Sequence, residues 1–374
     1  MVAVIVASLL VIPVGLSYLV EGLRSAPTPP ATLSWAPETP ISHVNVDGVN
    51  LRYIKVGQGS PLVLLHTLRT QLDMFQKVIP TLSQHFEVYA LDSPGHGFSD
   101  IPNVEYTPEL FIKSVAGFLE QVNIENATVM GESIGGSVAL ALAARHNPRV
   151  RGVIAVNPYD YDEGRGLRRS SAIANLIFGL NDVPILGSTF VRLRQYPVFQ
   201  KVMEGGVAHK NALPPALLHE MYSVGNRPHH YQAFMSLVAH WADWEKARAE
   251  YPKIDVPVLL VYGDHDWSRQ EEREANHRAI PGAQMTIVKD AGHFLALDAP
   301  EALTQLIRDF TLRPGLPGRK GAARVVMPAL SERGGSRALF EDRTGGGTVH
   351  ESDPSAPARR AGGSPVRRGT RSET

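Results

Sequence analysis

The chain has 374 residues, 37 of them basic and 37 acidic, so its formal net charge is zero, and 43% of its residues are apolar. This length is ample for one large α/β domain with an inserted segment. The balanced charge lacks the basic footprint of a nucleic-acid-binding protein, so nucleic acid is not an expected partner. The absence of cysteine excludes disulfides and thiolate chemistry.

The first 20 residues carry no charge. A helix of that length spans about 30 Å, which is the thickness of the hydrocarbon layer of a bilayer. We therefore predict that residues 1–24 form a membrane anchor that localises the protein to a membrane. The alternative is a signal peptide, whose cleavage would release a secreted protein. Residues 25–40 are rich in Pro, Ser and Thr and predict an extended spacer.

Residues 41–157 read as the first part of an α/β core, and its most informative stretch is Gly131-Glu132-Ser133-Ile134-Gly135-Gly136. An apolar strand pattern precedes this stretch, and a run of good helix formers follows it. The pattern predicts a tight strand-to-helix turn that exposes the Ser133 hydroxyl. Gly131 and Gly135 would let neighbouring backbone approach without a Cβ clash.

Residues 253–313 read as the second part of the core and carry two further motifs. The buried strand pattern at 256–262 runs into Gly263-Asp264-His265-Asp266, and the short strand pattern at 285–288 leads to Ala291-Gly292-His293. The chain order is therefore serine, acid, histidine, each just after a strand. These are the groups that nucleophilic catalysis by serine requires.

These motifs in this order resemble those of cap-bearing α/β-hydrolases, a family that includes esterases, lipases, carbon–carbon bond hydrolases and haloperoxidase-like enzymes. The resemblance covers about residues 41–312. It implies an α/β fold whose central sheet is mostly parallel, with helices on both faces and an inserted helical cap. It also implies a catalytic triad of Ser133, His293 and Asp266, with Asp264 as a neighbour, and no cofactor.

One departure from the family pattern lies at the oxyanion loop. His66 follows an apolar strand pattern where the family carries a His-Gly motif, but this chain continues with Thr67, Leu68 and Arg69. By position, the backbone N–H groups of Leu68 and Ile134 should hold the oxyanion, and the Thr67 hydroxyl is an alternative donor. Loss of one such donor raises the barrier by about 3 kcal/mol. We expect His66 to be structural and Asp92 to fix a loop.

About a hundred residues, 158–252, separate the two parts of the core, which is too long for a loop, and their helical patterns predict a cap. Its large apolar residues are candidates to line a pocket: Phe178, Phe190, Met203, Met221, Tyr222, Phe234, Met235 and Trp241. Of these we select Phe178, Tyr222, Phe234 and Trp241.

Histidines 96, 229, 230 and 240 lack metal-binding spacing, so we expect no metal and read them as surface or cap-lining residues. Residues 314–374 are rich in Gly, Pro, Ser and Arg and predict a disordered basic tail.

The sequence thus predicts a serine hydrolase that cleaves a carboxylic ester, with a small lipophilic ester or a lipid as substrate. Carbon–carbon bond hydrolysis and haloperoxidase chemistry are alternatives, because both use the same triad on this fold. A third hypothesis is a binding or scaffolding protein with weak chemistry, and Thr67 is its only support.

Overall fold

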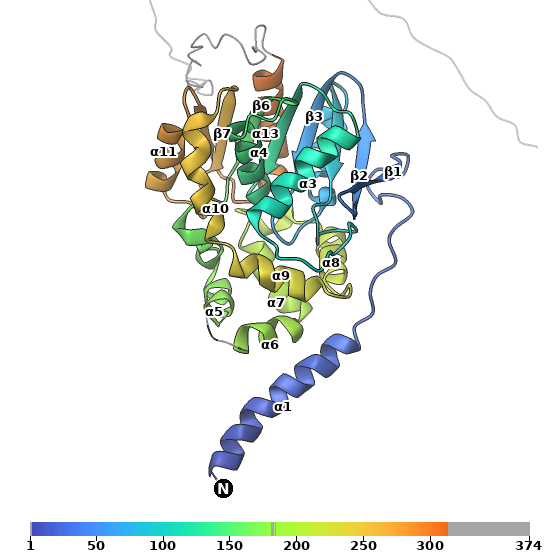
Figure 1. The fold of residues 1–374 in the computed structure, drawn as a ribbon, viewed down its shortest axis with the longest axis vertical. Helices are drawn as coiled ribbons and strands as arrows, with labels where there is room; N and C mark the ends of the chain where they lie inside the picture. The colour runs from blue at the N-terminus through green and yellow to red at the C-terminus, as the bar shows by residue number, and fades with distance from the viewer. Residues whose placement is uncertain (1, 181–182, 184, 313–374) are drawn as a thin grey trace, which may run out of the picture. The chain divides into compact units, whose positions relative to one another are not determined.

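The computed structural model of the protein describes residues 2–180, 183 and 185–312, with the backbone alone for residues 2–10. The tail predicted at 314–374 lies outside these residues. One eight-stranded sheet organises the fold (Figure 1). Its strands are β1 (Ile41–Val46), β2 (Val49–Val56), β3 (Ser60–Leu65), β4 (Phe86–Leu91), β5 (Ala127–Glu132), β6 (Val150–Val156), β7 (Val258–Gly263) and β8 (Gln284–Val288).

The strand order in the sheet is β1-β2-β4-β3-β5-β6-β7-β8. Only the pairings of β2 with β1 and with β4 are antiparallel; the others are parallel. Asp47 and Gly48 join β1 to β2 with φ values of 50° and 85°, the left-handed backbone that a two-residue hairpin turn requires. The predicted α/β class with a mostly parallel sheet is confirmed.

Helices cover both faces of the sheet. The longer helices of the core are α3 (Pro108–Gln121), α4 (Ile134–Ala144), α11 (Gln270–Ala279) and α13 (Pro300–Thr311), and the short ones are α2 (Ile79–Leu82) and α12 (Leu295–Asp298). Phe111 and Phe118 of α3 pack in one apolar cluster with α4, whereas Ile307 and Phe310 of α13 pack in a second cluster with Leu64 of β3. The sheet is buried between these clusters, which explains why its central strands are apolar on both faces.

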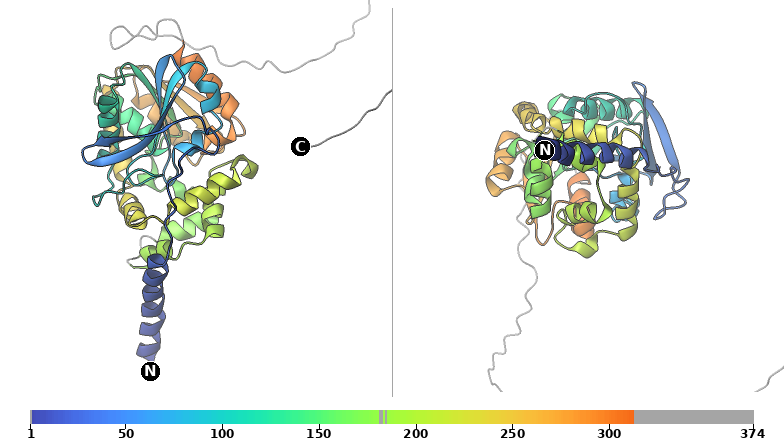
Figure 2. Two further views of the ribbon diagram at one scale, coloured as in Figure 1. Left: turned by 90° about the vertical axis from the view of Figure 1, so that its right-hand side faces the viewer. Right: turned by 90° about the horizontal axis from the view of Figure 1, so that it is seen from below.

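The cap, residues 158–252, follows β6 and precedes β7. Its helices are α5 (Ala172–Leu180), α6 (Leu186–Arg192), α7 (Tyr196–Glu204), α8 (Pro215–Val224), α9 (His230–Ala239) and α10 (Asp243–Lys246). Helices α5, α6, α7 and α9 gather on one side of the core (Figures 1 and 2).

The N-terminal helix α1 (Val2–Gly22) corrects one prediction. Among the residues that the structure describes, no helix combines the length and the apolar character needed to cross a membrane. This finding contradicts the anchor and the membrane localisation expected from residues 1–24. The physical reason lies in the polar residues near the end of α1: Arg192 Nε donates to Ser17 Oγ over 2.9 Å, and Arg194 forms an ion pair of 2.6 Å with Glu21.

Residues 25–40 are largely irregular, and part of this segment contacts the core. Leu33 is 1% exposed within the second apolar cluster. The indole N–H of Trp35 donates to Asp73 Oδ1 over 2.8 Å. This part of the segment therefore packs on the core and does not stand off as a free spacer.

Candidate active site

Ser133 occupies the turn between β5 and α4, with φ 59° and ψ −120°. A non-glycine residue in this region is strained, at a cost of about 1–3 kcal/mol, and such strain occurs mainly at functional sites. The turn is held by hydrogen bonds from Ser133 N–H to Val156 carbonyl (2.8 Å) and from Tyr159 N–H to Ser133 carbonyl (3.2 Å). The neighbouring strand β6 thus stabilises the strained turn.

The two glycines that flank this serine are required by close backbone contacts. A Cβ on Gly131 would lie 2.0 Å from the carbonyl oxygen of Gly135, and a Cβ on Gly135 would lie 2.3 Å from the carbonyl oxygen of Leu65. Backbone atoms cannot yield to such contacts, so both positions exclude any side chain. The glycines thus allow α4 to begin close against β5 and β3.

His293 lies in the loop after β8 and pairs with Asp266, which follows β7. The Nδ1 atom of His293 lies 2.5 Å from Asp266 Oδ1. The Nε2 atom of His293 is buried and has no hydrogen-bond partner among the described residues. Burial raises the pKa of Asp266, but the charge and hydrogen bond of His293 and two hydrogen bonds from Ser268 outweigh it and lower the pKa below its ordinary value.

Further contacts hold this pair in place. The N–H and hydroxyl groups of Ser268 donate to Asp266 Oδ2. The indole ring of Trp267 stacks on the His293 imidazole, with 3.7 Å between ring centroids. The side-chain amide of Asn157 donates to the His293 carbonyl over 2.9 Å and accepts from Gly263 N–H over 3.0 Å, so it ties the end of β7 to the histidine loop.

Asp264, the other acid of the motif, has a different environment. It is exposed, and its Oδ1 accepts the Ala291 N–H over 3.2 Å. Its ion-pair partner is His265, at 3.8 Å. The geometry therefore separates the two acids: Asp266 faces His293, whereas Asp264 braces the start of the histidine loop.

The loop after β3 has a defined hydrogen-bond pattern. His66 Nε2 accepts the Ser93 N–H over 2.9 Å, so its proton is on Nδ1, which donates to the Thr67 carbonyl over 2.7 Å. Burial lowers the pKa of His66 to about 4, so the ring is neutral. The Thr70 hydroxyl donates to the same Thr67 carbonyl over 2.8 Å. Left-handed backbone occurs at Arg69, with φ 63°.

Asp92 holds the neighbouring loop. One of its carboxylate oxygens accepts the N–H of Leu72 over 2.7 Å, and the other accepts the N–H of Phe98 over 2.8 Å. Asp92 also forms a buried ion pair of 3.1 Å with Arg52. These contacts connect the loops that follow β3 and β4.

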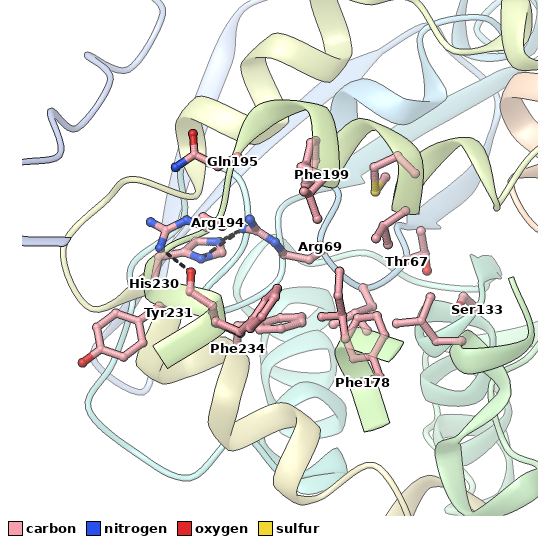
Figure 3. A pocket seen from close by; sticks show the side chains of 18 of the residues that line it. Thr67, Arg69, Ser133, Phe178, Arg194, Gln195, Phe199, His230, Tyr231 and Phe234 are labelled. Carbon is pink, nitrogen blue, oxygen red and sulfur yellow. Dashed lines mark hydrogen bonds between the residues drawn. The ribbon is translucent and has the colours of Figure 1, made fainter. Parts of the chain in front are cut away.

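A cavity of about 380 Å³ lies between the core and the cap, with Ser133 in its wall (Figure 3). Its walls are mostly apolar. The apolar lining residues include Leu68, Leu167, Ile177, Phe178, Phe190, Val198, Phe199, Val202, Met203, Phe234, Trp267 and Phe294. A cavity of this size fits a small-molecule ligand.

Four of the eight pocket candidates line this cavity, namely Phe178, Phe190, Met203 and Phe234. Tyr222 and Trp241 do not, which corrects their selection. Tyr222 packs edge-on against Tyr196, with ring centroids 5.4 Å apart, and Trp241 packs against Phe178, at 6.5 Å. Both belong to the layer of the cap that supports the lining. Phe199 and Phe294 line the cavity and were missed.

Two histidines read as surface or cap-lining residues are buried. The His96 ring packs against His66, with 5.2 Å between ring centroids, and burial lowers its pKa to about 3. His230 lines the cavity. Within the described part of the chain, no group of three or more His, Asp or Glu side chains is arranged to hold a metal ion.

Glu132 is fully buried beside Ser133, and burial raises its pKa to about 8. An acid whose pKa rises on folding binds its proton more tightly in the native state, so the free energy of unfolding falls as the pH rises from about 4.5 to about 8. Glu132→Gln should abolish this contribution. The melting temperature should therefore fall less between pH 5 and pH 8 in the variant than in the wild type, and equal falls would contradict a buried neutral Glu132.

Comparisons with known proteins agree with the fold. The family model described as the alpha/beta hydrolase fold matches residues 60–300. A pimeloyl-[acyl-carrier protein] methyl ester esterase of Neisseria meningitidis is 29% identical, over 66% of this chain and 91% of its own. A 2-hydroxy-6-oxo-2,4-heptadienoate hydrolase of Pseudomonas putida is 24% identical, over 70% and 93%.

Among solved structures, an enol-lactonase from Burkholderia xenovorans superposes with a TM-score of 0.60 at 25% identity, over 73% of this chain and all of its own. The matched range 60–300 contains the strained serine, the buried acid–histidine pair and the whole cap. Because this family model matches well over half of the chain, the protein belongs to the α/β hydrolase fold family.

Proposed function

We propose that the protein is a serine hydrolase that cleaves a carboxylic ester through Ser133, His293 and Asp266. One observation carries the proposal: His293 binds Asp266 through Nδ1 and keeps Nε2 buried without a partner among the described residues, in a site whose serine lies on a strained turn. A general base needs this arrangement, because the acid fixes the tautomer that leaves Nε2 able to accept a proton.

The proposed reaction has two halves. The Ser133 oxygen attacks the ester carbonyl carbon while His293 Nε2 takes the hydroxyl proton. The tetrahedral intermediate collapses, His293 returns the proton to the leaving oxygen, and the alcohol departs from an acyl-enzyme. Water then attacks the acyl-enzyme while His293 takes one of its protons. The bond between the Ser133 oxygen and the acyl group breaks, His293 returns the proton to Ser133, and the carboxylic acid is released. Asp266 stays ionised throughout, in keeping with its lowered pKa, and stabilises the imidazolium.

Two backbone N–H groups are proposed to hold the oxyanion. Ile134 is the first residue of α4, so its N–H has no partner within the helix. The Thr67 carbonyl is held toward His66 and Thr70, and the trans peptide points the Leu68 N–H in the opposite direction. Thr67, Leu68 and Ser133 line the same cavity, which supports Leu68 as the second donor. Threonine can therefore replace the family's glycine without disturbing this peptide.

The apolar cavity supports a substrate with an apolar acyl chain. Each buried CH₂ contributes about 0.8 kcal/mol, equivalent to about a fourfold gain in affinity. We expect kcat/KM for 4-nitrophenyl esters to rise from acetyl to at least hexanoyl, until the chain fills the cavity. Initial rates for the series would measure this, and a profile that peaks at acetyl and then falls would contradict it.

A variant that narrows the cavity provides the second half of this test. Val202→Phe adds a ring to the lining and should flatten the series beyond butanoyl. Val104→Phe makes the same change on a surface loop, where Val104 is 51% exposed, and should leave the series unaltered. Equal profiles for the two variants would place the acyl chain elsewhere.

A second candidate is carbon–carbon bond hydrolysis, favoured by the similarity to the Pseudomonas putida hydrolase. The same triad would serve it, so the substrate decides between the two reactions. Turnover of 2-hydroxy-6-oxo-2,4-heptadienoate far above that of any ester in the series would favour this candidate. Efficient ester cleavage with no turnover of the dienoate would support the esterase.

A further inference from the structure

The cavity is polar at the end remote from Ser133. Arg69 extends from the loop after β3 toward His230 and Arg194 of the cap, while Ser133 lies at the opposite end (Figure 3). Nη1 of Arg69 lies 3.2 Å from Nδ1 and 3.1 Å from Nε2 of His230. Because a guanidinium only donates, it bonds whichever of these ring nitrogens carries no proton.

Arg69 differs from its neighbour Arg194 in its partners. Arg194 forms an ion pair of 2.6 Å with Glu21 and donates to the Val191 carbonyl over 3.0 Å. Arg69 has no carboxylate within ion-pair distance among the described residues, and its Nε and Nη2 atoms donate to none of them. The Arg69 side chain is partly buried, and a cation withdrawn from water is costly when it has no counter-charge. Two of the donor groups of Arg69 thus lack a partner within the described part of the chain.

The charged groups around Arg69 do not neutralise its positive charge. Burial lowers the pKa of Arg69 to about 9, and the nearby positive charge of Arg194 adds to this effect, as does that of Arg24. Glu21 is the only acid in this group, and it already binds Arg194. Burial lowers the pKa of His230 well below its ordinary value, so its ring is neutral. This end of the cavity therefore carries a net positive charge.

The protein also makes room for the guanidinium. A Cβ on Gly225, at the end of α8, would lie 2.7 Å from both terminal nitrogens of Arg69. The ring faces of Phe199 and Phe234 lie 5.4 and 5.6 Å from the guanidinium carbon, within the range of cation–π attraction. Glycine and aromatic residues thus hold Arg69 in the cavity without neutralising its charge.

We propose that Arg69 binds a carboxylate at the far end of the substrate's acyl chain, so that the preferred substrates are monoesters of dicarboxylic acids. This inference rests on the proposed function. The planar fork of Arg69 matches a carboxylate through two parallel hydrogen bonds. The apolar walls between Ser133 and Arg69 take up the methylene chain.

The position of Arg69 in the chain couples this site to the reaction. Arg69 follows Leu68 directly and adopts left-handed backbone, so a bound carboxylate restrains the loop that carries the Leu68 N–H. Binding energy from a remote part of a substrate then contributes to kcat, because it orders a group used in the transition state. The anionic ester should therefore gain in kcat as well as in KM.

The test compares three activated esters of equal acyl length at pH 7: the mono-4-nitrophenyl ester of hexanedioic acid, the same compound with its free carboxyl methylated, and 4-nitrophenyl hexanoate. In the wild type, kcat/KM for the anionic ester should exceed that of both neutral esters by about tenfold or more, as expected for hydrogen bonds to a charged group. In Arg69→Met the ratio of kcat/KM for the anionic ester to that for the neutral esters should fall to about one. Arg69→Lys should keep part of the preference for the anionic ester.

Arg149→Met is the matched control. Arg149 pairs with Glu125 at the start of β6, at the end of the sheet remote from Ser133, and its loss should leave the ratio at the wild-type value. A ratio of one or less in the wild type overturns the proposal. So does a ratio in Arg69→Met that equals the wild-type ratio.

A binding measurement separates this proposal from the proposed function. Monomethyl hexanedioate and methyl hexanoate are titrated calorimetrically into Ser133→Ala. Tighter binding of the monoanion, lost in Ser133→Ala/Arg69→Met, supports the carboxylate site even when no ester is cleaved, in which case the proposed function alone fails. Equal binding of both compounds overturns the carboxylate site whether or not esters are cleaved.

Discussion

Ser133→Ala and His293→Ala should each lower kcat/KM for 4-nitrophenyl butanoate by about three orders of magnitude or more. The reason is that nucleophile and base act as a unit, so removal of either one abolishes the same step. The double variant should be no slower than the worse single variant, because the second change removes nothing that still functions. Initial rates with protein purified from an esterase-deficient host would measure this.

Ser137→Ala is the matched control for this experiment. Ser137 lies one turn further along α4 and is 1% exposed, and among the described residues its hydroxyl donates a hydrogen bond only to the Ser133 carbonyl, over 3.5 Å. Loss of this hydroxyl should change the rate by no more than a few-fold. Turnover near the wild-type level in Ser133→Ala or His293→Ala would refute the assignment.

Asp266→Asn should lower kcat by up to about ten-thousandfold, because the amide donates a hydrogen bond to His293 Nδ1 and so moves the ring proton to Nε2. A ring protonated on Nε2 cannot accept the Ser133 proton. Asp264→Asn should have a much smaller effect, since its carboxylate is exposed, accepts the Ala291 backbone N–H and does not contact His293. The two substitutions are chemically identical and two residues apart, so each controls for the other.

Circular dichroism and melting temperatures would establish that both asparagine variants fold. A larger loss in Asp264→Asn than in Asp266→Asn would assign the acid to Asp264, against the 2.5 Å contact between Asp266 and His293.

The parts of the fold that could be predicted were those set by local pattern. Central strands buried on both faces require continuous apolar runs, so β5 and β7 were visible in the sequence, and the residues that follow them belong to the site. The choice between Asp264 and Asp266 came from the family resemblance. The contacts of Ser268 and Trp267 that hold the pair depend on tertiary packing and had no local signal.

The cavity wall was harder to predict. An amphipathic cap helix presents apolar residues to the core of the cap and to the cavity alike, and the period of 3.6 residues does not separate these two faces. Tyr222 and Trp241 were therefore selected although they support the lining, while Phe199 and Phe294 were missed. The sequence did contain a signal for Arg69, because this charged residue directly follows Leu68, the predicted oxyanion donor, and therefore lies close to the site.

The N-terminal segment shows the limit of composition. A charge-free run of 20 residues suggested an anchor, but composition does not reveal that Arg192 and Arg194 of the cap bind Ser17 and Glu21. The two residues of each contact lie more than 170 positions apart in the chain. They became visible only in the fold.

Covalent labelling tests most directly whether Ser133 is a nucleophile activated by His293. The protein is treated with a fluorophosphonate and digested, and the modified peptide is sequenced by mass spectrometry. We predict one adduct, on Ser133, which forms rapidly in the wild type and in Ser137→Ala and at least about a hundredfold more slowly in His293→Ala. A folded wild-type protein that stays unlabelled, or that is labelled on another residue, would contradict the account and favour a binding or scaffolding role.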